Sequence, residues 1–184
     1  MRATVNASPL IFLAKIGKLN LLDIILTQFC VSDIVWEETV EKGLSHGYVE
    51  AELIRRFANR QVVEVKKEKA KKLAEKFSIH VGEASTILLA KKLNFEHVVV
   101  DDKVAIKVAK IMGLKPLSTP FILLKALREQ HLTHKQFIGC FEKLIASGYY
   151  ISPILSKEIL KRAEKMKTRS KTLENKSEKR QFSS

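Results

Sequence analysis

The chain has 184 residues, an apolar fraction of 46% and a formal net charge of +13, which favours one globular domain with a core of ordinary size. It contains no CxxC pair, no GxxxxGK[ST] or GxGxxG loop and no HExxH motif, so a zinc ribbon is excluded and nucleotide-loop and zinc-protease sites have no support. No apolar run approaches the roughly 20 residues that span a bilayer, and no secretory signal is visible, so we expect a cytoplasmic protein.

The positive charge is spread over the whole chain. Residues 161–184 carry nine basic and three acidic side chains, and the remainder is still basic. Such a surface suits a polyanionic partner, because bound phosphates release counterions. A lysine-rich solvated surface of a heat-adapted protein explains the composition equally well. Cys30 and Cys140 stand among apolar residues, and we expect both to be buried thiols.

The first half of the chain has the pattern of alternating strands and helices. Ser8-Pro9 supplies a helix cap and a proline for the first helical position, and Gly17 ends that helix. Asp33 is expected to cap a later helix that carries Glu38. In chain order, the expected elements are a strand at 3–6, helices at 9–16 and 19–26, a strand at 29–31, a helix after residue 33, a helix at 49–58 and a strand at 62–65.

The second half continues this alternation and then becomes helical. The helix expected at 66–77 has an apolar side and a lysine-rich side, and Thr133 with Gln136 forms a capping box. In chain order, the expected elements are helices at 66–77 and from 82, a strand at 98–101, a helix ending at 112, a strand at 114–117, and helices at 119–130, 134–148 and from 153.

Strands that alternate with helices predict an α/β fold with a parallel sheet covered on both faces. We expect one such domain over residues 1–166, with extra C-terminal helices. Residues 167–184 are mainly Lys, Ser, Glu and Arg and bury too little apolar surface to order themselves. We therefore predict a disordered basic tail at 167–184.

Four carboxylates and one amide stand where strands end or helices begin: Asn6, Glu38, Glu83, Asp101 and Asp102. In a parallel sheet these positions meet at one edge, where open α/β sheets build their sites. Oxygen ligands of this kind suit Mg²⁺ or Mn²⁺, which can polarise a phosphodiester and activate water. Three of the acids also have simpler roles. Glu83 can complement the positive charge of a helix N-terminus, Asp102 can serve as an N-cap, and Glu38 can lie on a solvated surface.

Five short motifs resemble those of PIN-domain nucleases. The first, Val5-Asn6-Ala7-Ser8-Pro9-Leu10-Ile11, is similar to the prokaryotic branch in which an acid or Asn precedes a small residue and Ser-Pro-Leu. The others follow in the family's order: Val35-Trp36-Glu37-Glu38, Gly82-Glu83-Ala84-Ser85, Val99-Val100-Asp101-Asp102 and Ser118-Thr119. The resemblance covers roughly residues 3 to 165.

The resemblance implies a three-layer α/β/α PIN-like domain that cleaves RNA with Mg²⁺ or Mn²⁺. Many such proteins are VapC-type toxins that a small antitoxin protein inhibits, so an antitoxin is an expected partner. Apolar residues on the helices near 48–57 or 137–150 suit either a homodimer or an antitoxin. The implied catalytic residues are Glu38, Glu83, Asp101 and Asp102. The implied metal ligands are Asn6, Glu83, Asp101 and Asp102. Ser8 and Thr119 are the implied substrate-binding residues, and Thr119 has a second implied role behind the ligands.

Some positions depart from the family pattern. Asn6 replaces the usual acid, and an amide ligates through only one uncharged oxygen. Ile106 stands where Arg is common, and Ser118 where Gly is usual. These changes leave a second hypothesis, a catalytically degenerate PIN fold that binds RNA or a protein. The lysine-rich side of residues 66–76 is more typical of a solvated surface than of an RNA-binding one.

Overall fold

The computed structural model describes residues 1–58 and 61–166. Two compact units divide the chain between Ile122 and Leu123. The first unit contains every strand of the described chain and all the proposed site residues. The predicted basic tail at 167–184 lies outside the described residues, and the domain boundary at 166 stays a prediction.

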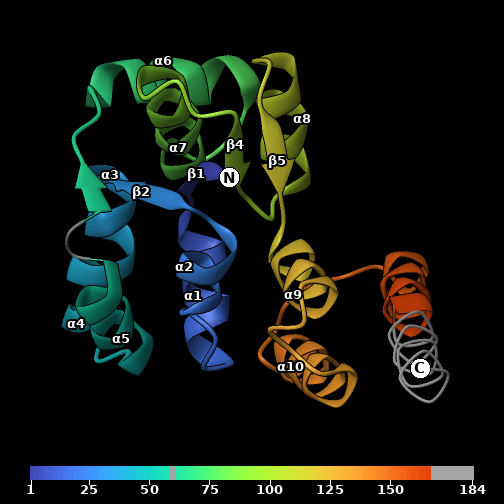
Figure 1. Ribbon diagram of the computed structural model, residues 1–184. Coiled ribbons are helices and arrows are strands. Elements are labelled where there is room, and N and C mark those ends of the chain that lie inside the picture. Colours follow the sequence, from blue (N-terminus) through green and yellow to red (C-terminus); the bar gives the residue numbers. More distant parts are fainter. Residues whose placement is uncertain (59–60, 167–184) are drawn as a thin grey trace, which may run out of the picture. The chain divides into compact units, whose positions relative to one another are not determined.

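A parallel sheet organises the first unit (Figure 1). Its strands stand in the order β3-β2-β1-β4-β5, and every neighbouring pair is parallel. From β1 the chain builds outward through β2 to β3 and then returns to the other side of β1, so the order reverses between β1 and β4. Such a switch point is where ligands bind in open α/β sheets. The strands are β1 (Arg2–Val5), β2 (Gln28–Ser32), β3 (Val62–Val63), β4 (His97–Val99) and β5 (Lys115–Leu117).

Helices connect the strands, as the alternation predicted. The segment before α4 is π-helical, a rare form that is frequent at functional sites. The helices are α1 (Ala7–Lys15), α2 (Leu21–Ile25), α3 (Asp33–Trp36), the π-helix η1 (Glu37–Glu41), α4 (Lys42–Ser45), α5 (Val49–Ala58), α6 (Lys67–Phe77), α7 (Val81–Lys92), α8 (Lys103–Ile111), α9 (Thr119–Arg128) and α10 (His134–Ala146).

Helices cover both faces of the sheet, which confirms the predicted α/β class. On one face, the Thr4 hydroxyl donates to the main-chain oxygen of Thr86 in α7 at 2.8 Å. On the other face, Phe29 of β2 stacks on Phe57 of α5 with ring centroids 5.5 Å apart. Alternate strand residues point to opposite faces, so a strand buried on both is nearly all apolar. The strand β4 and Val100 after it show this pattern.

Several element boundaries differ from the predicted ones. Asn6, not Ser8, is the N-cap of α1. The cap of α3 is Ser32, whose hydroxyl accepts from the Val35 amide at 3.1 Å, whereas Asp33 accepts from the Val65 amide at 3.0 Å. Both polar residues lie at a helix start, so only the tertiary contact to Val65 distinguishes them. The strand predicted at 98–101 ends at Val99, which places Asp101 in the following loop.

The second unit is helical over its described part. The predicted capping box begins α10: the Gln136 amide donates to Thr133 Oγ1 at 3.2 Å and the Thr133 amide donates to Gln136 Oε1 at 2.8 Å. Residues 153–166 form a further helix. Cys30 and Cys140 are both buried, as predicted. No helix among residues 1–58 and 61–166 is long and apolar enough to cross a membrane.

Candidate active site

Asn6 and Asp101 follow neighbouring strands at the switch point. Val5 of β1 pairs with Val99 of β4, and the Asn6 amide continues that ladder by donating to the Val99 oxygen at 3.0 Å. Asn6 is therefore the first residue past its strand, and Asp101 the second past its own. Parallel pairing alone brings the two residues to the same sheet edge, as the sequence predicted.

Three donors hold the half-buried carboxylate of Asp101. The Thr119 amide donates to Oδ1 at 2.8 Å, and the Thr119 hydroxyl donates to Oδ2 at 2.7 Å. The Ser8 hydroxyl donates to the same Oδ2 at 3.3 Å. Thr119 is fully buried, so its side chain orients Asp101 from behind. Substrate binding by Ser8 and Thr119 stays a prediction.

Glu83 is the most buried acid of the set, with 7% of its surface exposed. Its Oε2 accepts from the His80 amide at 2.9 Å, which begins α7. Burial raises the pKa of the Glu83 carboxyl, the His80 amide opposes that rise, and the negative charges of Asp102 and Glu38 add to it. The negative charges of Asp102 and Glu38 therefore repel that of Glu83, and a cation among the three carboxylates would relieve this repulsion.

Gly82 leaves space beside its main chain for the side chains of Glu38 and Asn6. A β-carbon on Gly82 would lie 2.8 Å from Glu38 Oε2 and 3.6 Å from Asn6 Oδ1. The absence of a side chain therefore lets the exposed Glu38 of η1 and the buried Asn6 both pack against residue 82. Sequence reasoning treated Gly82 only as part of a motif. Its role depends on where η1 packs, which the sequence does not show.

Thr86 is a site residue that sequence reasoning missed. Its hydroxyl lies 2.9 Å from the Gly82 oxygen and 3.4 Å from Asn6 Oδ1, so one proton serves two acceptors. The bond to Asn6 is therefore weak, and the amide oxygen keeps acceptor capacity. A signal for Thr86 exists in the sequence. Thr86 stands directly before the apolar run Ile87–Ala90, and a hydroxyl buried in such a helix must find a partner, because an unpaired buried polar group is costly.

Asp102 caps α8, and its side chain is exposed. Its Oδ1 accepts from the Val104 amide at 2.7 Å and from the Ala105 amide at 2.9 Å. The simpler role expected for Asp102 is thus confirmed, and its charge still acts on Glu83. Metal binding and catalysis by Asp102 stay predictions.

The donor set fits a hard divalent cation by its chemistry, because every candidate ligand offers oxygen. In the present arrangement, however, no three His, Cys, Asp or Glu side chains of the described residues are close enough to hold a metal ion. Asp101 is turned toward Thr119, and Asp102 toward its own helix. The common field of Glu83, Asp102 and Glu38 is the observation that favours a cation.

Comparison with known proteins agrees with this geometry. A family model described as PIN domain matches residues 2–165. No functionally curated protein matches the chain. The crystal structure of PAE2754 from Pyrobaculum aerophilum is similar at 16% sequence identity, over 63% of this chain and 92% of that one, with a TM-score of 0.43.

Proposed function

The chain belongs to the PIN-domain family, whose members are generally nucleases that use divalent metal ions, and we propose that it hydrolyses RNA phosphodiester bonds with Mg²⁺ or Mn²⁺. The observation that carries the proposal is the cluster at the switch point. There Glu83 has a raised pKa, and two other acids act on it. The chain's basic character supports a polyanionic substrate.

In this proposal the cluster residues divide the work. Asn6, Glu83, Asp101 and Asp102 hold the ion, and Glu38 orients the attacking water and receives its proton. Ser8 and Thr119 keep Asp101 in place through the bonds described above. A bound divalent ion would stabilise negative charge and lower the pKa of water. The water oxygen attacks phosphorus, the bond from phosphorus to the 3′ oxygen breaks, and that oxygen takes a proton from solvent. The products carry a 5′-phosphate and a 3′-hydroxyl.

The test is cleavage of single-stranded RNA in Mn²⁺ by the wild type and by the Asp101→Ala and Glu83→Ala variants. We expect both variants to lose at least about a hundredfold in rate, because each removes a charge from the cluster. Glu68→Ala is the control, since Glu68 is an exposed acid of α6. Equal cleavage by wild type and both cluster variants would contradict the assignment.

A second candidate function is a catalytically degenerate module that binds RNA or a protein without cutting it. Two observations favour it: Asn6 stands where the family usually has an acid, and no three acids of the described residues form a closed metal site. Isothermal titration with Mn²⁺ separates the two functions. No heat of binding, together with RNA binding that falls steeply with salt, would support the degenerate module.

We also propose a toxin role with a small antitoxin, or a homodimer, as partner. The support is that each unit exposes several large apolar side chains, which a protein partner could cover. They include Leu44, Val49 and Leu53 in the first unit, and separately Ile145, Ile154 and Leu155 in the second. Co-expression with the product of any small neighbouring reading frame, followed by co-purification and RNA cleavage assays, tests this role. Cleavage that the co-purified product leaves unchanged would contradict it.

A further inference from the structure

A pocket opens directly beside the proposed catalytic cluster. It has a volume of about 340 Å³ and lies between α1, η1, α4 and α5, at the small end of the range for ligand sites. Glu38 lines it, and Oε2 of the same side chain lies 2.8 Å from where a β-carbon of Gly82 would stand, next to Glu83. A ligand in the pocket would therefore lie beside the cluster. We call it the Tyr48 pocket, after one of its two rings.

Two aromatic rings form one wall of this pocket. The rings of His46 and Tyr48 are stacked, with centroids 5.8 Å apart and an angle of 12° between planes. Tyr48 has 60% of its surface exposed, although buried aromatic rings are the norm for a folded domain. Exposed, nearly parallel rings are what single-stranded RNA sites use, because every base has a π-face.

The end of α4 fixes the two rings in place. Gly47, at φ +73°, occupies the left-handed position of a Schellman motif. The Gly47 amide donates to the Leu44 oxygen at 3.0 Å, and the Tyr48 amide donates to the Gly43 oxygen at 3.0 Å. This turn sets His46 and Tyr48 on either side of one glycine. The platform is thus built before any ligand arrives, which reduces the entropy cost of binding.

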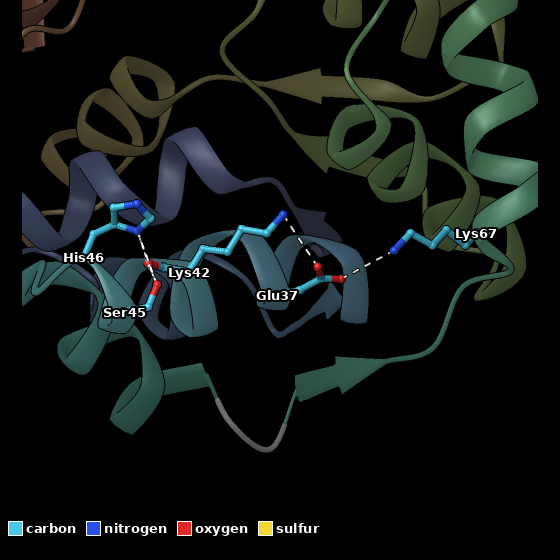
Figure 2. A network of polar contacts seen from close by, with 5 residues as sticks. All are labelled: Glu37, Lys42, Ser45, His46 and Lys67. Atoms are coloured by element: carbon cyan, nitrogen blue, oxygen red, sulfur yellow. Dashed lines mark hydrogen bonds and ion pairs between the residues drawn. The ribbon is translucent and has the colours of Figure 1, made fainter.

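His46 is anchored further by its ring. Its Nδ1 lies 2.7 Å from the Lys42 main-chain oxygen, which can only accept, so Nδ1 carries a proton. Ser45 Oγ stands 3.3 Å from the same nitrogen and donates to the same oxygen at 2.8 Å. Figure 2 shows His46 beside Ser45 at one end of this network. In the neutral ring, Nε2 is then an acceptor.

Two lysines, Lys15 and Lys42, line the pocket with the rings. Lys42 Nζ is 3.6 Å from Glu37 Oε1, and Lys67 Nζ is 3.7 Å from Glu37 Oε2, so Glu37 lies between both lysines in Figure 2. These ion pairs are exposed and therefore weak, which leaves Lys42 able to turn to a phosphate. Lys15 comes from α1, the helix that begins at Asn6. The pocket also contains Glu50, an acceptor for amino groups on a base edge.

A larger pocket of about 570 Å³ lacks this combination. Its wall contains four lysines: Lys66, Lys69, Lys91 and Lys92. Its other lining residues include no aromatic ring and none of the proposed catalytic residues. Lysines alone are a solvated surface more often than a binding site. The Tyr48 pocket combines two stacked rings with two lysines, which two glutamates balance in charge, and it shares Glu38 with the cluster.

We propose that the Tyr48 pocket binds one nucleotide of single-stranded RNA next to the scissile phosphate. The base of that nucleotide stacks on the Tyr48–His46 pair, and Lys42 with Lys15 contacts its phosphate. The inference rests on the proposed ribonuclease function and adds the site at which one nucleotide of the substrate is bound. It assigns Tyr48 and His46 a role in substrate binding rather than in bond breaking.

A double-mutant cycle tests the stacking. One arm is Tyr48→Leu; the other is a set of RNAs with one cleavage site, each with a single abasic ribose at a different position. We expect Tyr48→Leu to raise KM roughly tenfold on intact RNA with kcat nearly unchanged, as loss of one stacked base predicts. On the RNA whose missing base is the stacked one, the substitution should have no further effect. Tyr150→Leu is the control, since Tyr150 is exposed but outside the pocket.

Each outcome of this cycle is informative. An unchanged KM for Tyr48→Leu, or equal losses at every abasic position, overturns the inference and leaves the ribonuclease proposal standing. Failure of the wild type to cleave or bind any RNA overturns both. A shift from dimer to monomer in Tyr48→Leu with an unchanged KM overturns the inference, because it would show that a protein covers this surface. Unchanged thermal stability of Tyr48→Leu is expected, since the ring is exposed.

The lysines have a test of their own. We expect Lys42→Gln and Lys15→Gln each to reduce the magnitude of the slope of log binding constant against log salt concentration by about one, which corresponds to one lost phosphate contact. Lys115→Gln is a matched control, because Lys115 is an exposed lysine paired with one acid, Glu96, at the opposite end of the sheet. Equal slopes for all three variants would overturn the phosphate contact.

Discussion

Thr119 donates two hydrogen bonds to the carboxylate of Asp101, one from its amide at 2.8 Å and one from its hydroxyl at 2.7 Å. The two residues follow neighbouring strands, Asp101 after β4 and Thr119 after β5. Hydrogen bonds to a charged group are stronger than neutral ones. Thr119 therefore fixes the direction of the Asp101 carboxylate, which we propose as a metal ligand.

Thr119→Val removes the hydroxyl bond and keeps the shape and the amide bond. We expect a loss of about 1.5–3 kcal/mol in the free energy of unfolding, because a buried charged group loses one donor. Catalytic rate should fall about tenfold or more as Asp101 becomes mobile. Denaturant unfolding and RNA cleavage measure the two effects. Thr119→Ser keeps the hydroxyl and should recover most of the activity; the same loss in Thr119→Ser would argue against this bond.

Gly82→Ala should harm activity more than stability. The added β-carbon would lie 2.8 Å from Glu38 Oε2, and the exposed Glu38 side chain can move away at little cost. That movement takes the Glu38 carboxylate away from the cluster. We expect the RNA cleavage rate to fall about tenfold relative to the wild type, with a nearly unchanged melting temperature.

Gly139→Ala is the matched control for this change. Gly139 also lies in a helix, and nothing stands within 4 Å of its would-be β-carbon. Alanine there should stabilise α10 by about 1 kcal/mol or less, through helix propensity alone. Cleavage should be unaffected. Normal activity in Gly82→Ala would show that Glu38 does not act from this position.

The raised pKa of Glu83 predicts how stability depends on pH. The folded protein binds the Glu83 proton more tightly than the unfolded chain, whose carboxyl has the ordinary value of 4.5. Folding takes up protons in this window, so stability falls as pH rises from about 4.5 through the folded pKa. Glu83→Gln should therefore raise the melting temperature at pH 7.5 in EDTA and have no such effect below about pH 4.5.

Two comparisons check the origin of that effect. Mn²⁺ should stabilise the wild type more than Glu83→Gln, since the ion relieves repulsion only where the charge is present. Glu96→Gln should show a small effect of opposite sign, because the Lys115 hydrogen bond lowers the pKa of the exposed Glu96 carboxyl. A melting temperature of Glu83→Gln equal to that of the wild type at every pH would refute the buried charge.

Asn6→Asp tests whether position 6 faces the metal. Asn6 has 5% of its surface exposed, and its Oδ1 is 3.6 Å from the Gly82 β-carbon position, which is 2.8 Å from Glu38 Oε2. A carboxylate there should tighten Mn²⁺ binding about tenfold, equivalent to roughly 1.4 kcal/mol, and lower stability without metal. Titration calorimetry measures the affinity, with Asn6→Ala as control. An equal affinity for Asn6→Asp and wild type would place residue 6 outside the site.

Sequence patterns predicted much of the fold for a local reason. Cap and turn residues such as Gly17, Thr133 and the Ser-Pro and Thr-Pro pairs act within one helical turn, so a helix can be located from them. Boundaries failed where two neighbours competed for one role, as Ser32 and Asp33 did. The sequence also gave no reason to expect η1, because a π-helix has no distinct apolar spacing.

The order of residues along the chain is enough to show that an amide and several acids follow buried strands or begin helices. The parallel connection of those strands brings such residues to one edge, so Asn6, Asp101 and Glu83 were predicted together. Which contacts they make depends on the packing in three dimensions. Three features join segments far apart along the chain or depend on how helices pack. They are the room that Gly82 leaves for Glu38, the hydrogen bonds from Thr119 to Asp101, and the Tyr48–His46 wall beside them. Such packing depends on the three-dimensional shape of the elements, and no periodic pattern in the sequence signals it.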